Sequence, residues 1–273
     1  MSRLKPWLPP QLLRIARHML GHGGHFRGDF TSWEEASRHT AGYNAENILK
    51  RVLEATCAVR DGNAAYERDG VLFAHPQDPY PLIAVLMRAA ALANGHLRVL
   101  DFGGALGSSY FQCRHWLDHV PAVDWCVIEQ PHFVATGNKQ LANHQLRFAD
   151  SITQVASHTP FDVVLFSGVL QYLPTPIEIV QQAAAIKPRF IVIDRTPTIR
   201  ATHDHIRIQK QATRGLPPSS YPIRLFAEST LLQVASLGYR LLSRFDAVDE
   251  PMGGIGSRVD FKGYIFEHKD ASC

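Results

Sequence analysis

The pattern of apolar and polar residues changes near residue 95. Before it, apolar positions recur at helical spacing; after it, short apolar runs alternate with helical segments. A short apolar run bounded by glycine or polar residues is typical of a buried strand. This alternation predicts an α/β fold whose mostly parallel sheet is covered by helices on both faces. We therefore divide the chain into a helical N-terminal extension, residues 1–94, and a main domain, residues 95–273.

The main domain contains the segments that we interpret as strands. They cover residues 97–102, 125–128, 146–149, 161–166 and 190–193, and a C-terminal hairpin of residues 239–245 and 261–267. Polar residues follow several of these runs, including Glu129, Asp150 and Asp194. In open α/β sheets, ligands lie at the carboxyl ends of the strands, so these residues are candidates for binding.

The extension begins with a weakly structured lead, residues 1–30. Its basic and apolar segment, residues 11–20, fits a surface helix, or peripheral contact with an anionic membrane. Thr31 and Ser32 each precede a glutamate by three residues, which predicts a helix start. Further helices are predicted over residues 44–61 and 81–94, and residues 71–73 are expected to be extended.

A glycine-rich turn follows the first strand of the main domain. Gly103, Gly104 and Gly107 come directly after Asp101-Phe102, and a helix is predicted from Ser108. Glycine has no Cβ, so the backbone can turn sharply and approach a ligand closely. The carboxylate of Asp101 opposes a pyrophosphate over this turn and favours a ligand with a positive group.

The run Asp101-Phe102-Gly103-Gly104-Ala105-Leu106-Gly107 resembles the first motif of the class I S-adenosylmethionine-dependent methyltransferases, although Ala105 replaces the middle glycine. The resemblance implies a Rossmann-like sheet of seven strands with the last strand antiparallel, and S-adenosylmethionine as cofactor. Residues 161–173 are similar to the fourth motif of the same family. The implied cofactor-binding residues are Asp101, Gly103, Gly104, Gly107, Glu129, Asp150, Ile152, Ser167 and Gly168.

Two of these residues carry specific expectations. Glu129 would accept hydrogen bonds from the ribose hydroxyls, a feature shared with NAD-binding folds. Asp150 would accept from the adenine amino group, with Ile152 against the ring; alternatively, Asp150 is the N-cap of a helix.

The resemblance also extends to one bacterial methyltransferase family found near surface-polysaccharide genes. It covers most of residues 26–268. The residues that carry it are Trp33, Gly42-Tyr43, Tyr66-Glu67-Arg68-Asp69, Asp101 to Phe111, Glu129-Gln130, Leu170-Gln171-Tyr172, Asp194-Arg195-Thr196-Pro197, Gln209 and Ser220-Tyr221-Pro222.

Residues 197–225 interrupt the strand–helix rhythm and are expected to form a lid over the acceptor, with a weak helical pattern over residues 205–213. Residues 200–224 contain five cationic residues against one aspartate, a net charge of +4, which favours an anionic small-molecule or sugar-linked acceptor. If the nucleophile is a hydroxyl, a base is needed. His203 and His205 are the candidates, with Asp204 as a group that could orient them.

The composition of the chain excludes several classes of protein. The chain has 273 residues and a net charge of +3, without a dense basic-aromatic patch, so no nucleic-acid partner is expected. No apolar run reaches the about 20 residues of a transmembrane helix. Four cysteines without CxxC spacing indicate reduced thiols in a cytoplasmic protein, with no metal site. The sequence specifies no oligomeric state.

Two other classes of function remain as alternatives. A nicotinamide-dependent oxidoreductase or epimerase of nucleotide sugars would have a Gly-x-Gly-x-x-Gly turn without Asp101, and usually a Tyr-x-x-x-Lys pair, which is not found after the fourth strand. A non-catalytic cofactor-binding module would bind the cofactor without turnover.

Overall fold

The computed structural model describes residues 26–40, 45–156, 160–211, 219–248 and 258–270. Its strands are β1 (Phe26–Phe30), β2 (Tyr66–Arg68), β3 (Val71–Phe73), β4 (His96–Phe102), β5 (Ala122–Ile128), β6 (Leu146–Ala149), β7 (Val163–Ser167), β8 (Phe190–Ile199), β9 (His205–Gln211), β10 (Ser219–Ala227), β11 (Tyr239–Asp246) and β12 (Asp260–His268). Its helices are α2 (Trp33–Arg38), α3 (Ala45–Arg60), α4 (Tyr80–Leu92), α5 (Ser108–Cys113), α6 (Pro131–Gln140), α7 (Ile152–Ala156), α8 (Pro176–Ala185) and α9 (Glu228–Leu232), with 3-10 turns η2 (Arg114–Trp116), η3 (Leu170–Tyr172) and η4 (Gln233–Leu237).

The predicted main sheet is confirmed. Strands β6, β5, β4, β7 and β8 lie side by side in parallel, with β4 near the centre. Strand β12 pairs antiparallel with both β8 and β11, so the last strand runs against the others. These seven strands are those that the sequence implied, and the carboxyl ends of the parallel strands meet at one edge.

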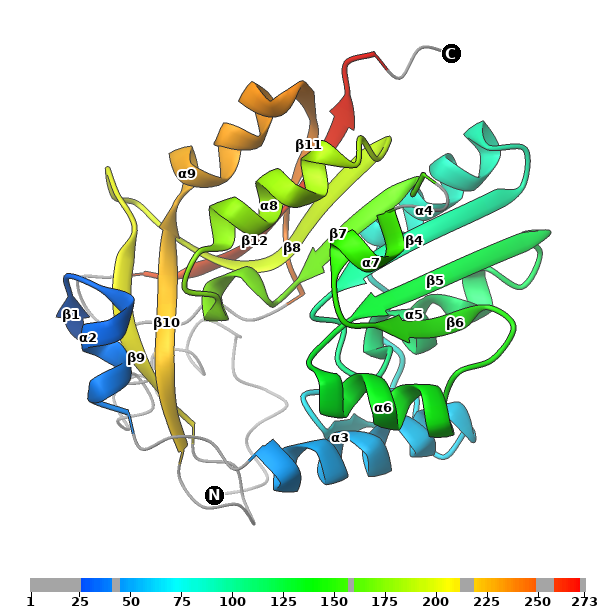
Figure 1. The fold of residues 1–273 in the computed structure, drawn as a ribbon, viewed down its shortest axis with the longest axis horizontal. Helices are drawn as coiled ribbons and strands as arrows, with labels where there is room; N and C mark the ends of the chain where they lie inside the picture. Colours follow the sequence, from blue (N-terminus) through cyan, green and yellow to red (C-terminus); the bar gives the residue numbers. More distant parts are fainter. Residues whose placement is uncertain (1–25, 41–44, 157–159, 212–218, 249–257, 271–273) are drawn as a thin grey trace, which may run out of the picture.

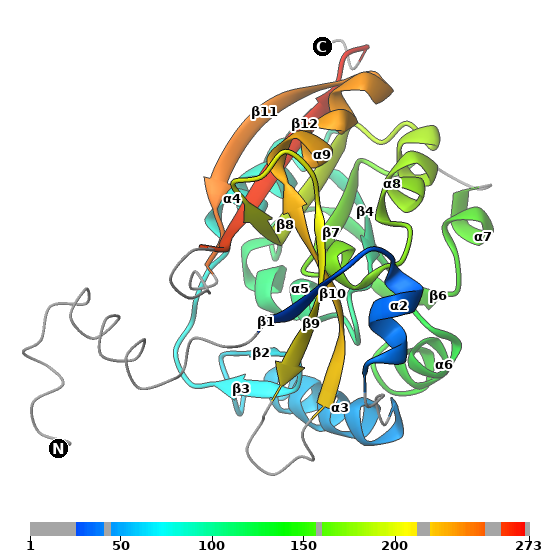
Figure 2. The same cartoon turned by 90° about the vertical axis from the view of Figure 1, so that its left-hand side faces the viewer.

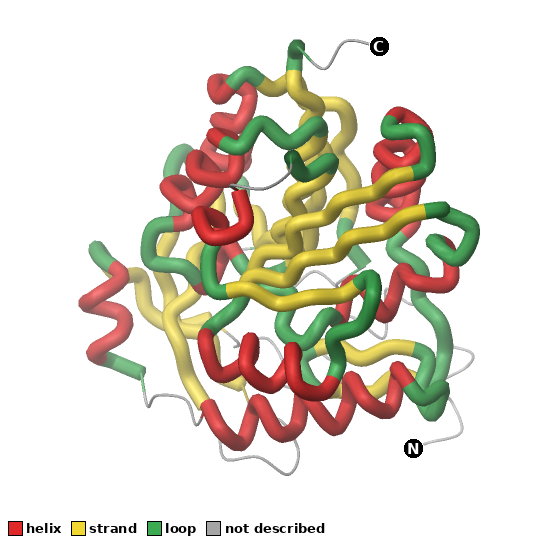
Figure 3. Tube along the Cα trace, turned by 45° about the vertical axis from the view of Figure 1, so that its right-hand side comes forward, coloured by secondary structure: helices red, strands yellow, loops and turns green. Residues whose placement is uncertain are grey.

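Helices cover both faces of this sheet (Figure 1 and Figure 3). One apolar cluster joins α3, α4, α5 and α6 to one face, with Leu86, Val99 and Trp125 fully buried. A second cluster joins α7, α8 and α9 to the other face, around Leu100, Val164 and Phe266. Because the parallel strands are buried on both faces, they read as continuous apolar runs in the sequence.

Three further strands enlarge the sheet. Strand β10 continues the sheet from the carboxyl end of β8, where Phe226 and Ala227 pair in parallel with Thr198 and Ile199. β10 then pairs antiparallel with β9, and β9 with β1. We call β1, β9 and β10 the side ribbon. Figure 2 shows it in front of the main sheet, with α2 beside it.

The side ribbon corrects two predictions. The weak helical pattern over residues 205–213 was wrong, because residues 205–211 form β9. Isoleucines at positions 206 and 208 are buried while Gln209 is only half-buried, which is the alternation of a strand. Residues 26–30 were expected to belong to a weakly structured lead, but they form β1 against β9.

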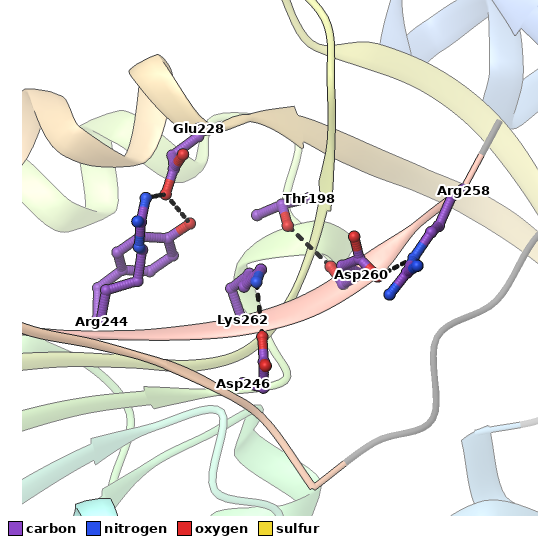
Figure 4. Close-up of polar contacts among 8 residues, drawn as sticks. Thr198, Glu228, Arg244, Asp246, Arg258, Asp260 and Lys262 are labelled. Atoms are coloured by element: carbon purple, nitrogen blue, oxygen red, sulfur yellow. Dashed lines mark hydrogen bonds and ion pairs between the residues drawn. The ribbon is translucent and has the colours of Figure 1, made fainter.

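Strand β8 is longer than predicted. The apolar run ends at Ile193, yet the strand continues to Ile199, because β12 pairs with it along its whole length. Figure 4 shows the polar contacts that hold β12 there. Thr198 Oγ donates to the Asp260 carbonyl at 2.8 Å, and Lys262 pairs with Asp246 of β11 at 2.6 Å. Asp194 and Arg195 therefore lie inside a strand.

The N-terminal extension packs on the main domain through the first apolar cluster, to which Val52, Val59 and Leu82 belong. Ser32 caps α2 by accepting from the Glu35 N–H at 3.1 Å, so the predicted helix start is confirmed. The extension also contains the β2–β3 hairpin. The basic segment of residues 11–20, with its predicted membrane contact, lies outside the described residues. In the described part of the chain, none of the helices has the length and apolarity to cross a membrane.

Candidate active site

The glycine turn connects β4 to α5 and is shaped by steric contacts. Gly103 has φ +71°, and a Cβ there would overlap the Val169 side chain. A Cβ on Gly104 would lie 2.5 Å from the Asp101 carboxylate. Gly107, the N-cap of α5, has φ +91°. The backbone at Gly103 and Gly107 requires glycine, and at Gly104 the space beneath the turn does.

Asp101 lies beneath this turn and is fully buried. Its Oδ2 accepts from Trp125 Nε1 at 3.2 Å, whereas its Oδ1 is buried without a hydrogen-bond partner in the described structure. Desolvation is the main cause that raises the pKa of Asp101 to about 7; the Trp125 bond lowers it and the charge of Glu129 raises it. A buried carboxylate with one open oxygen favours a ligand that brings a donor or a positive charge.

Glu129 follows β5 and reaches the glycine turn. Its Oε2 accepts from the Gln130 N–H at 2.8 Å, and the Ala105 N–H also donates to it. Burial raises the pKa of Glu129, and these two bonds oppose the rise. Ala105 has φ +51°, a conformation that costs a residue with a Cβ about 1–2 kcal/mol.

Asp150 and Ile152 lie at the next strand end. Asp150 is exposed, and Ile152 is 5% exposed within the second apolar cluster. The cap of α7 is Ser151, whose Oγ accepts from the Gln154 N–H at 3.2 Å. Ser151, and not Asp150, therefore caps α7.

The end of β7 packs against both the glycine turn and the end of β8. Ser167 is half-buried, and Gly168 follows it with φ +70°. The Gly168 N–H donates to the Asp194 carbonyl at 3.0 Å. A Cβ on Gly168 would lie 3.4 Å from Cζ of Arg195, so this guanidinium lies directly over the glycine.

Arg195 was included in the sequence analysis only as part of the family resemblance. Its position at the site was not predicted. It has φ +54°, and its N–H donates to Asp194 Oδ1 at 2.8 Å. Gln171, which is 3% exposed, donates from Nε2 to the Gly168 carbonyl at 2.9 Å and to the Arg195 carbonyl at 3.5 Å. Strained backbone that is held by several contacts is characteristic of functional sites.

The N-terminal extension contributes Glu67, which sequence reasoning also missed. Glu67 lies on β2, is 4% exposed, and accepts from Ser108 Oγ at the start of α5 and from the Gly70 N–H at 3.0 Å. Burial raises its pKa, which the Ser108 bond and the charge of Arg195 oppose. The β2–β3 turn therefore lies beside both α5 and Arg195.

The side ribbon forms an aromatic and amide wall against η3. The ring of Tyr172 meets that of Tyr221 edge to face at 5.3 Å, and Tyr172 Oη donates to Gln209 Oε1 at 3.2 Å. Tyr172 is 40% exposed. Gln209 and Tyr221 are register partners on β9 and β10, so their side chains share one face of the ribbon.

His203 and His205 lie at the opposite end of β9. Their rings stack at 5.0 Å, and His205 Nδ1 is 3.0 Å from the Asp29 carboxylate of β1. Asp204 does not orient either ring, because its Oδ1 accepts from the Ala227 N–H at 2.9 Å and from Thr230 Oγ at 2.7 Å. Asp204 instead satisfies the start of α9.

Within the described ranges, no group of three or more His, Cys, Asp or Glu residues could hold a metal ion. The cysteines that the structure describes, Cys57, Cys113 and Cys126, are free.

Comparison with known proteins identifies the family. A family model described as a methyltransferase domain matches residues 73–234, which is more than half of the chain. No curated protein matches the sequence.

Several solved structures are similar to this chain. The N-terminal domain of EvdMO1, in the presence of SAH and D-fucose, is 17% identical over 83% of this chain and 97% of that one, with a TM-score of 0.45. The sugar N-methyltransferase KedS8 from Streptoalloteichus sp ATCC 53650 is 15% identical over 68% and 86%, with a TM-score of 0.45. CalS10, an amino pentose methyltransferase from Micromonospora echinaspora, is 14% identical over 78% and 96%, with a TM-score of 0.43.

Proposed function

The chain belongs to the methyltransferase domain family and is an S-adenosylmethionine-dependent enzyme, and we propose that it methylates an anionic small-molecule or sugar-linked acceptor, by O-methylation. One observation carries the choice of cofactor. The open, buried Oδ1 of Asp101 lies beneath a glycine turn in which a Cβ at Gly103 or Gly104 would collide with a neighbour. This cradle fits a ligand with an ammonium and a sulfonium group.

The proposed cofactor contacts follow the ends of β4 to β7. Glu129 would bind the ribose hydroxyls, Asp150 the adenine amino group, and Ile152 the ring. The methionine part would lie along the turn and the end of β7. The full proposed set is Asp101, Gly103, Gly104, Gly107, Glu129, Asp150, Ile152, Ser167 and Gly168.

The cofactor supplies an electrophilic methyl group on a sulfonium. The protein's own contribution is then to align the acceptor with that group and to exclude water. A hydroxyl acceptor must lose its proton, and His203 or His205 is the proposed base, because a neutral imidazole nitrogen can accept a proton. Tyr172 is the next candidate.

Residues 197–225 are proposed to form the acceptor side of the site. They include the end of β8 together with β9 and β10, and η3 lies beside β10. The net charge of +4 over residues 200–224 supports an anionic acceptor. A nucleotide-linked or lipid-linked sugar fits this charge. A place in surface-polysaccharide synthesis, in the cytoplasm near the membrane, is part of the same proposal.

Calorimetry with S-adenosylmethionine, its demethylated product SAH, and NAD tests the cofactor. We expect binding of the first two and negligible binding of NAD, because Asp101 opposes a pyrophosphate. Glu129→Ala should weaken cofactor binding about tenfold or more without unfolding the protein, since charge-assisted bonds contribute about 1.5–3 kcal/mol each. Tight NAD binding without detectable S-adenosylmethionine binding would contradict the proposal.

The base is tested separately once an acceptor is identified. Replacing His203 and His205 together by glutamine should abolish methyl transfer and leave cofactor binding intact. Full turnover of this double variant would assign the base to another residue, with Tyr172→Phe as the next variant to measure.

A further inference from the structure

Arg195 holds a cation at the edge of the sheet where the acceptor must meet the methyl group. It comes from β8, and its guanidinium lies over Gly168, which follows β7. Gly168 is next to Val169, which closes on the glycine turn at Gly103. Contacts through Val169 and Gly168 thus connect the glycine turn to the Arg195 guanidinium.

The backbone of Arg195 is fixed on both sides. Asp194 accepts from its N–H, and the buried amide of Gln171 donates to its carbonyl. Its φ of +54° is unfavourable for a residue with a Cβ, so these contacts maintain a conformation that the residue would otherwise avoid. A side chain whose backbone is held in this way presents its charge at a defined place.

Two of the described cations within residues 200–224, Arg224 and Lys210, are less well placed for this role. Arg224 donates to the Pro174 carbonyl at 3.1 Å and lies 3.7 Å from Asp204, so it serves the ribbon itself. Lys210 is exposed and, by strand alternation, lies on the opposite face of β9 from Gln209. Arg207 shares the face of Gln209, and its Nε is buried with no hydrogen-bond partner among the described residues.

Aromatic rings complete the surroundings of Arg195. Tyr172 interacts electrostatically with Arg195 and contacts both Tyr221 and Gln209. Aromatic faces pack against apolar ring surfaces, and an amide donates to or accepts from hydroxyls. A guanidinium beside such a wall matches an acceptor that has a hydroxylated ring and an anionic group.

We propose that Arg195 is the specificity-determining residue that binds the anionic group, a phosphate or a carboxylate, of a sugar acceptor. The inference rests on the proposed methyltransferase function and goes beyond it by assigning acceptor recognition to one residue of β8. The guanidinium fork binds such an anion in a bidentate manner. Arg207 provides a second cation on the facing wall of the ribbon.

The experiment uses the full chain saturated with SAH and three probe sugars. Glucose 1-phosphate, glucuronate and glucose share a ring, and the first two carry a phosphate and a carboxylate. Calorimetry should show that at least one anionic sugar binds about tenfold or more tightly than glucose. The comparison of the two anionic probes then distinguishes a phosphate from a carboxylate.

Matched variants assign this preference to Arg195. Arg195→Gln should reduce the preference for the anionic sugar to within about twofold, and Arg195→Lys should retain part of it, because the charge remains but the fork is lost. Lys210→Gln removes the same charge from the face of β9 opposite Gln209 and should leave the preference unchanged. SAH binding of each variant serves as the folding control.

The possible failures are distinct. If the wild-type protein does not bind SAH, the proposed function fails. If SAH binds but neither anionic sugar is preferred over glucose, or Arg195→Gln keeps the preference, Arg195 does not determine acceptor specificity. An equal loss in Lys210→Gln would assign the effect to net charge and would likewise overturn the inference.

Discussion

The glycine turn and the side ribbon are built in different ways, although both border the carboxyl edge of the sheet. The turn is local: Asp101 to Gly107 are seven consecutive residues, and a Cβ at Gly103 or Gly104 would collide with a neighbouring side chain. The ribbon is assembled from distant segments, as in the pair of Asp29 and His205, which are 176 positions apart. Its contacts toward the site, such as Tyr172 to Gln209, are polar and partly exposed.

This difference indicates how each region tolerates change. Steric exclusion in a tightly packed turn permits one backbone path, so a substitution there disrupts the cradle as a whole. Exposed polar pairs contribute little to stability, so the wall of the ribbon can change side chains without loss of the fold. The glycine turn is therefore specified by shape, and the side ribbon by chemistry that can vary independently.

The largest effect is expected at Gly104. Gly104→Val would place a side chain onto the buried Asp101 carboxylate, 2.5 Å from the glycine's ideal Cβ position, and should abolish SAH binding. Calorimetry measures the binding, and thermal unfolding measures the stability of the variant. We expect a destabilisation of about 1–3 kcal/mol from overpacking.

The control for this variant is Gly62→Val. Unlike Gly104, Gly62 has a positive φ, +78°, but its Cβ would meet no atom within 4 Å. It should lower stability through backbone strain and leave SAH affinity unchanged. Equal loss of affinity in both variants would contradict the steric account of the turn.

A second large effect concerns Asp101 and pH. The pKa of Asp101 is about 7 in the folded protein, above the ordinary aspartate value of 3.8, so the folded state binds the proton more tightly than the unfolded state. Its stabilising contribution is therefore fully present below about pH 4 and is lost as pH rises to about 7. The loss amounts to about 1.4 kcal/mol per unit of pKa difference.

Denaturation of the cofactor-free wild type and of Asp101→Asn from pH 4 to 8 measures this contribution. The free energy of unfolding of the wild type should fall relative to that of the variant as pH rises from about 4 to about 7. Above that, the difference between the two should stay constant. A constant difference from pH 4 to 8 would show that Asp101 keeps an ordinary pKa.

The same contrast explains what the sequence could predict. The main sheet follows from apolar runs such as Val163 to Phe166, because a strand that is buried on both faces carries its signal within itself. The glycine turn is equally local. The position of Asp101 before Gly103 and Gly104 was sufficient to expect a positively charged ligand, and the structure adds its open oxygen.

The ribbon and the polar wall could not be predicted in this way. β9 is a strand because β1 and β10 pair with it, and these distant partners cannot be identified from the residues of β9 alone. Glu67 reaches Ser108 across 41 positions, and Arg195 lies in a strand only because β12 pairs alongside it. The alternation of Ile206 and Ile208 was the one local signal that could have identified β9.

A moderate effect is expected from Asp204, which tests whether the ribbon depends on its own polar contacts. Asp204→Ala removes the acceptor of the Ala227 N–H and of Thr230 Oγ at the start of α9. We expect a loss of about 1–2 kcal/mol, the usual cost of removing a helix-capping side chain. Chemical denaturation measures the loss.

Asp204→Asn should recover part of the stability, since an amide oxygen still accepts from the N–H. SAH affinity should be the same in both variants, because Asp204 lies directly before β9 and makes no contact with the glycine turn in the described structure. A loss of SAH affinity in Asp204→Ala would show that the two regions are coupled.

The smallest effect should be a gain in stability at position 105 of the glycine turn, where a residue with a Cβ has a positive φ. Ala105 has φ +51° in a turn whose neighbours at 103 and 107 are glycines with positive φ. Ala105→Gly relieves the Cβ strain, but it increases the freedom of the unfolded chain, so the net stabilisation should be about 1 kcal/mol or less. Thermal unfolding can resolve this gain against Ala84→Gly, an exposed position inside α4 where glycine should cost about 1 kcal/mol.

Ala105→Gly retains the backbone N–H that donates to Glu129. SAH affinity should therefore stay within about twofold of the wild-type value, well below the about 1.4 kcal/mol of a tenfold change. If Ala105→Gly instead destabilises the protein as much as Ala84→Gly, the left-handed conformation at residue 105 carries no strain, and shape alone does not specify this half of the site.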